Sequence, residues 1–197
     1  MFQRHFQELL LRKAVTMRLL DKTFFFYFFI SSSLFLAFSS CRTSREISGS
    51  KKEAVESSVT QKKFSALLNV PAEKLSNSAL YSFIEEWYGV PYKYGGNNKK
   101  GIDCSNFTAA LFKKVYDKTV TGSSASLFDQ CKVIPKKELK EGDLVFFKIE
   151  NKNVSHVGIY LQNNKFVHAT TKKGVMIDDL DEDYYKKYFY KAGRLIN

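Results

Sequence analysis

The first part of the chain that we expect to be folded has apolar residues at helical spacing. In residues 71–89 they recur at steps of three and four, as on one face of a helix: Leu80, Phe83, Ile84 and Trp87. The spacing predicts one or two helices here, ended by Gly89 and Pro91. A second helix is predicted over residues 104–116, with Asp103 available just before it as a cap. Its shared face is formed by Phe107, Ala110, Leu111 and Val115.

From Leu144 onward the pattern changes to short runs rich in Val, Ile and Phe, separated by turn-like segments. The runs are DLVFFKI, SHVGIYLQ, KFVHAT and GVMIDDL. They predict an antiparallel meander, followed by a short helix near residues 181–187 and a last strand near residues 189–195. Helices followed by strands indicate an α+β fold, with the helices packed on one side of a five- to six-stranded antiparallel sheet. We expect one folded domain, residues 64–197.

The N-terminal part of the chain has the pattern of an export signal. Residues 24–38, FFFYFFISSSLFLAF, form an apolar run of signal-peptide length, with Arg18 and Lys22 before it. Small residues then precede Cys41, as in the lipobox of bacterial lipoproteins. We therefore expect residues 1–40 to be a signal peptide and Cys41 to be the acylated first residue of the mature protein. Secretion with cleavage nearby and an uncleaved anchor are the alternatives.

Two further expectations concern the same region. A signal peptide normally begins near its charged residues, so we expect translation to start at Met17 and not at Met1. Residues 41–63 are rich in Ser, Lys and Glu and poor in large apolar side chains, which predicts a flexible tether after the lipidated Cys41.

The chain carries a formal net charge of +11, from 31 Lys and Arg against 20 Asp and Glu. Such a charge favours an anionic partner. The sequence has no zinc-finger spacing, RNP-like strand or basic heptad helix, so we expect no nucleic-acid partner.

The folded part contains few residues able to carry nucleophilic chemistry. Cys104 lies where a helix begins, and helix N-termini favour a thiolate. His156 opens a predicted strand and His168 lies on the next one, so both imidazoles can reach one edge of the sheet. A buried cysteine and two ordinary histidines are the alternative reading, and the pattern alone does not decide between them. Cys131 has no assigned role, and we expect it to be buried and free.

Three segments in order resemble the NlpC/P60 family of cell-wall cysteine peptidases over roughly residues 85–195: PYKYGGNNKKGIDCSNF, KEGDLVFF and SHVGIYLQNNKFVHAT. The resemblance implies a papain-like fold in which Cys104 is the nucleophile, His156 its base and His168 the residue that orients the base. It also implies that the Tyr92 hydroxyl helps to hold the oxyanion. No metal or other cofactor is implied.

The resemblance gives less on substrate binding. Asp103, Ser105 and Gln130 match positions of possible substrate contact, although Asp103 also suits helix capping. Asn106 stands where the family usually has Gly, and the family's basic residue before Gln130 is absent.

These observations lead to one main function and two alternatives. We expect a monomeric peptidoglycan endopeptidase that acts on murein stem peptides or cross-links, anchored by lipid in the outer membrane and facing the periplasm. The alternatives are a peptidoglycan-binding module of the same fold that turns over weakly, and an amidase or acyltransferase acting on another amide.

Overall fold

A computed structural model describes residues 43–149 and 152–196, and for residues 43–54 it describes the backbone alone. Residues Ala54–Asn197 form one compact unit. The predicted signal peptide and Cys41 lie outside the described residues. Within the part of the chain that is described, no helix is long and apolar enough to cross a membrane.

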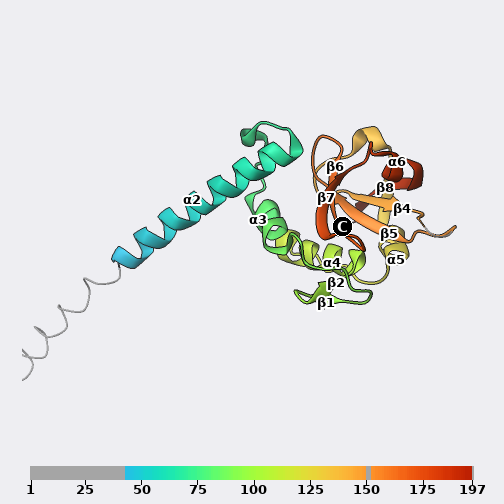
Figure 1. The fold of residues 1–197 in the computed structure, drawn as a ribbon, viewed down its shortest axis with the longest axis horizontal. Coiled ribbons are helices and arrows are strands. Elements are labelled where there is room, and N and C mark those ends of the chain that lie inside the picture. Colours follow the sequence, from blue (N-terminus) through green and yellow to red (C-terminus); the bar gives the residue numbers. More distant parts are fainter. Residues whose placement is uncertain (1–42, 150–151, 197) are drawn as a thin grey trace, which may run out of the picture. The chain divides into compact units, whose positions relative to one another are not determined.

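The first element differs from the predicted tether. Residues Thr43–Leu68 form helix α2 (Figure 1). Its last turns pack into the compact unit, because Phe64 and Leu68, four residues apart, are fully buried. The Gln61 amide adds hydrogen bonds to the carbonyls of Ala72 and Leu75, at 2.7 and 3.3 Å. Ser, Lys and Glu are tolerated in helices, so composition alone did not exclude one here.

Both helices predicted next are present. Helix α3, Ser78–Trp87, is capped by Asn77, whose side chain accepts a hydrogen bond from the Leu80 backbone N–H. Its predicted inner face is buried except for Trp87, which is half-buried. Helix α4, Cys104–Tyr116, has the predicted bounds and the predicted cap at Asp103. The remaining helices are the 3-10 turns η1, Ala72–Lys74, and η2, Lys136–Glu138, and the short α5, Ser124–Asp129, and α6, Asp183–Tyr188.

A six-stranded antiparallel sheet forms the other layer, in the order β3-β8-β4-β5-β6-β7. The predicted meander is present, and the predicted last strand, β8, joins it between β3 and β4. The strands are β3 Cys131–Ile134, β4 Leu144–Phe147, β5 His156–Tyr160, β6 Lys165–Thr170, β7 Gly174–Asp179 and β8 Phe189–Leu195. A separate hairpin pairs β1, Asn97–Asn98, with β2, Gly101–Ile102. The α+β prediction is therefore confirmed.

Both faces of the sheet are buried, as β4 shows. Leu144 and Phe146 pack in the main core with residues of α3 and α4, whereas Val145 and Phe147 pack in a second cluster with Tyr185 of α6. Successive side chains of a strand point to opposite faces, so β4 is apolar at every position. The predicted helices cover one face, and α6 adds a smaller cover on the other.

Candidate active site

Cys104 is the first residue of α4, and the loop before it is held tightly. Both Asp103 carboxylate oxygens are engaged: Oδ1 accepts from the Asn106 backbone N–H at 2.8 Å and from the Ser105 hydroxyl at 2.9 Å. Oδ2 accepts from the Gly95 N–H at 2.9 Å. Asp103 therefore caps the helix and ties it to the preceding loop, which fixes where the Cys104 sulfur lies.

Asn106, which departs from the family pattern, adds further hydrogen bonds between the start of α4 and the preceding loop. Its amide donates to the Gly96 carbonyl and to the Asp103 carboxylate, each at 3.1 Å. The side chain is thus used to hold the loop that contains Gly96 against the start of α4.

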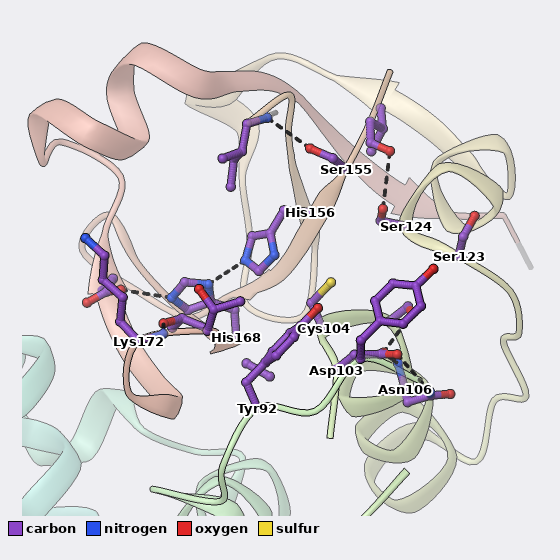
Figure 2. Close-up of a pocket in the computed structure, with 18 of the residues that line it drawn as sticks. Tyr92, Asp103, Cys104, Asn106, Ser123, Ser124, Ser155, His156, His168 and Lys172 are labelled. Carbon is purple, nitrogen blue, oxygen red and sulfur yellow. Dashed lines mark hydrogen bonds and ion pairs between the residues drawn. The ribbon is translucent and has the colours of Figure 1, made fainter. Parts of the chain in front are cut away.

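The two predicted histidines lie side by side on neighbouring strands. His156 begins β5 and His168 lies in β6, and His156 Nε2 is 2.6 Å from His168 Nδ1. Figure 2 shows the His156 ring between His168 and Cys104. Both rings are buried, and the ring of Phe166 packs on His168 with the ring centroids 4.6 Å apart. The structure thus brings the three predicted residues together.

Sequence reasoning missed two residues behind His168. Asp178 Oδ2 lies 2.9 Å from His168 Nε2, and the Tyr185 hydroxyl donates to the same carboxylate oxygen at 2.5 Å. Asp178 belongs to β7, the next strand of the sheet, and Tyr185 belongs to α6. One feature of the sequence could have pointed to Asp178, namely the alternation of side chains between the two faces of β7. His168 pairs with Met176, and Asp178 lies two residues further along β7 on the same face.

A groove of about 850 Å³ opens over these residues. Tyr92, beside Ile102 in an isolated bridge, lines it, and Figure 2 shows its side chain directed toward Cys104. Ser105 also lines the groove. Other residues lining the groove are Tyr94, Asn106, Ser124, Lys172, Lys173 and Tyr184.

Gln130 does not join this group. It is the residue after α5, its amide donates to the carbonyls of Thr121 and Ser126, at 3.0 and 2.8 Å, and it is not among the residues that line the groove. Cys131, next in the chain, is free as expected but half-buried and not fully buried, because it starts the edge strand β3.

Burial controls the charge states in the groove. Desolvation raises the pKa of the Cys104 thiol to about 11, although hydrogen bonds from the backbone of Val157 and Ser105 favour the thiolate. Desolvation, and then the neighbouring His168, holds the pKa of His156 well below its ordinary 6.5. Desolvation also lowers the pKa of His168, against the attraction of Asp178. Burial therefore favours the neutral forms of the thiol and of both imidazoles.

Several named proteins are similar to this chain over part of its length. "Probable endopeptidase NlpC" of Escherichia coli (strain K12) is 42% identical over 134 residues, which are 64% of this chain and 85% of that protein. "Probable endopeptidase NlpC homolog" of Haemophilus influenzae is 41% identical over 122 residues, 62% of this chain and 64% of the relative. "Murein DD-endopeptidase MepS/Murein LD-carboxypeptidase" of E. coli is 39% identical over 112 residues, 57% of this chain and 59% of the relative.

Solved structures agree with these sequence matches. An NLP/P60-family protein of Staphylococcus aureus, described as similar to lipoprotein, superposes with a TM-score of 0.55 at 28% identity, over 60% of this chain and 41% of its own. The sequence pattern that defines the NlpC/P60 family matches residues 89–194, from the loop before Cys104 to the last strand. Because that match covers more than half of the sequence, and holds all of the residues gathered around the groove, the chain belongs to the NlpC/P60 family.

Proposed function

We propose that this protein is a cysteine endopeptidase that hydrolyses amide bonds in the peptide part of peptidoglycan. The observation that carries the proposal is the alignment of Cys104, His156 and His168 along one groove, in a family whose members include murein endopeptidases. A nucleophile, a base within its reach and a third group that orients the base are the parts that thiol-mediated acyl transfer needs.

The reaction begins with a proton transfer. Since the Cys104 thiol and His156 are both neutral at rest, His156 takes the thiol proton as the sulfur attacks the amide carbon. A carbon–sulfur bond forms, and the carbonyl oxygen becomes an oxyanion. The N-terminal N–H groups of α4 and the Tyr92 hydroxyl stabilise that oxyanion, and one such preorganised donor typically contributes about 3 kcal/mol to lowering the barrier.

The second half of the reaction returns the groove to its resting state. Protonated His156 gives its proton to the leaving amine as the carbon–nitrogen bond breaks, which leaves a thioester on Cys104. His156 then removes a proton from a water molecule, which attacks the thioester. The carbon–sulfur bond then breaks as protonated His156 returns its proton to the Cys104 sulfur, and the released carboxylic acid gives its proton to solvent. The products are a carboxylate and the free thiol.

Within peptidoglycan we propose the D-alanyl to diaminopimelate cross-link as the bond cut, with the γ-D-glutamyl to diaminopimelate bond as the second candidate. The similarity to a relative named murein DD-endopeptidase supports the cross-link. Ser105 lies in the groove, with its hydroxyl bonded to Asp103, and is placed to contact the stem peptide.

The proposal is tested by incubating the protein with purified peptidoglycan and identifying released peptides by mass spectrometry. We expect the wild type to release fragments whose masses name the bond, and Cys104→Ala and His156→Ala to release none. Asp179→Asn serves as a control substitution in the same sheet, since Asp179 is not among the residues that line the groove and forms an ion pair with Lys165 at 2.7 Å.

Two negative results have different meanings. If neither the wild type nor any variant releases fragments, and all of them bind the wall, the peptidoglycan-binding module becomes the better account. If Cys104 becomes acylated by a different amide while peptidoglycan stays intact, the amidase or acyltransferase is favoured.

We propose further that the protein works in the cell envelope, held by acyl chains on Cys41 in the outer membrane and facing the periplasm. The apolar run and the small residues before Cys41 support this assignment. Two or three acyl chains make such anchoring stable where one would be marginal. Labelled palmitate should be incorporated by the wild type and not by Cys41→Ser, and incorporation by both would contradict the proposal.

A further inference from the structure

The hydrogen bonds behind the two histidines form a continuous line from α6 to the groove. Tyr185 donates to Asp178, Asp178 contacts His168 Nε2, and His168 Nδ1 contacts His156 Nε2. The Tyr185 hydroxyl is also 3.4 Å from His168 Nε2. The line is shielded from water, since His168 is 1% exposed and the Asp178 side chain 12%.

The hydrogens along this line can be assigned by counting. An ionised carboxylate only accepts hydrogen bonds, so Nε2 of His168 carries a hydrogen toward Asp178. A neutral imidazole carries one N–H, which leaves Nδ1 of His168 as an acceptor. Nε2 of His156, 2.6 Å away, must then donate to it. By the same count, Nδ1 of His156 has no hydrogen and is the nitrogen free to accept one.

We propose that Asp178, held by Tyr185, is a positioning residue that selects the tautomer of His168 and thereby makes Nδ1 of His156 the base for Cys104. The inference rests on the proposed function for its kinetic part only. Without the carboxylate, His168 can carry its hydrogen on Nδ1 as readily as on Nε2. His156 would then accept from His168 through Nε2, and its only N–H would be on Nδ1, so it could not take the thiol proton.

The geometry of the sheet supports a specific role for Asp178 over its neighbour. His168 pairs with Met176 across β6 and β7, and Asp178 lies on the same face, diagonal to His168. Asp179 points to the other face, where it pairs with Lys165. The two adjacent carboxylates therefore provide a test and a matched control on one strand.

The first measurement needs no substrate. In protein labelled with ¹⁵N at histidine, NMR shifts report which ring nitrogen carries the hydrogen. We expect both His156 and His168 to be protonated on Nε2 in the wild type and in Asp179→Asn. In Asp178→Ala we expect both rings to show a mixture of tautomers, with a smaller change in Asp178→Asn, which keeps an acceptor oxygen.

The second measurement is hydrolysis of a soluble peptidoglycan fragment. We expect Asp178→Ala to lower kcat about 10- to 100-fold with KM within about twofold, the size of effect typical when a metal-binding histidine loses the partner that orients its ring. Tyr185→Phe should lower kcat by less, and Asp179→Asn should leave it unchanged.

Retention of the Nε2–H tautomers in a folded Asp178→Ala would overturn the proposal, whatever happens to kcat. An equal loss of kcat in Asp179→Asn would also overturn the proposal, because it would point to a general effect of weakening β7. If the wild type does not cleave peptidoglycan, the proposed function fails, while the NMR result still decides the role of Asp178.

Discussion

Cys104 is placed where backbone N–H groups favour a thiolate, yet burial raises the pKa of its thiol to about 11. His156 is neutral for the same reason, because desolvation lowers its pKa well below 6.5. Burial therefore disfavours a thiolate–imidazolium pair in this groove. A thiol held in its neutral form is less prone to side reactions.

This charge state predicts slow alkylation of Cys104 near neutral pH. The folded pKa is above the ordinary value of 9.0, so the thiolate fraction, and with it the rate, should keep rising from pH 7 to about pH 10. The rate with iodoacetamide is measured by mass spectrometry in Cys131→Ala, which leaves one thiol in the described part of the chain. A rate that levels off below pH 8 would contradict the prediction.

Gly158 is needed because a side chain there would meet Phe166. A Cβ at this position would lie 2.5 Å from Phe166 Cδ2, and the Phe166 ring packs against His168. We expect Gly158→Ala to lower the free energy of unfolding by about 1–3 kcal/mol, measured by urea denaturation, and to lower kcat as His168 shifts. Adding Phe166→Leu, which removes the obstructing ring edge, should recover part of the stability; no recovery would show that the clash lies elsewhere.

Sequence reasoning proposed the three residues that the structure brings together at the groove, and it missed the two behind them, for a physical reason. Cys104, His156 and His168 are scarce residue types in distinctive motifs, and two of them sit on adjacent strands. Asp178 and Tyr185 are common residue types whose role depends on strand register and on the packing of α6. Gln130 was expected near the substrate from its position in a motif, but its backbone contacts hold it at the end of α5.

Among the elements, most of those with a clear apolar pattern were predicted, and length did not decide the outcome, since β4 and β3 are both four residues long. Helix α4 and strands β4 to β8 were found because burial imposes a regular pattern on them. Helix α5 and strand β3 were missed, since β3 is an edge strand of four residues with exposed positions at its centre. The part of helix α2 before residue 64 was predicted to be a tether because it has few large apolar side chains. The fully buried side chains of the described part of α2, Phe64 and Leu68, lie after it, in the predicted folded domain.

The contacts of α2 predict where the folded unit begins. A chain that starts at residue 64, the boundary expected from the sequence, lacks Gln61 and its hydrogen bonds to η1. We expect residues 64–197 to be less stable than residues 54–197 by about 1–2 kcal/mol, measured by urea denaturation. Gln61→Ala in the longer chain is the matched variant and should account for about half of the difference; equal stability of the two chains would contradict the prediction.

The net charge of +11 makes a prediction for the molecule as a whole. Peptidoglycan and the polymers attached to it carry carboxylates, so part of the binding should be electrostatic and screened by salt. Cys104→Ala, which binds without cleaving, should sediment with purified walls at low salt and much less at about 1 M salt, where the Debye length is about 3 Å. Sedimentation that does not change with salt would assign binding to the groove alone.

Strand β8 comes last along the chain but lies inside the sheet, between β3 and β4. A nascent chain that ends at Tyr188 has an open edge on β4, and its β3 has no partner. The sheet that carries His156 and His168 is therefore complete only after the final strand has been synthesised. For the proposed peptidase, cleavage of the wall would then begin only once the whole domain has been made and has folded.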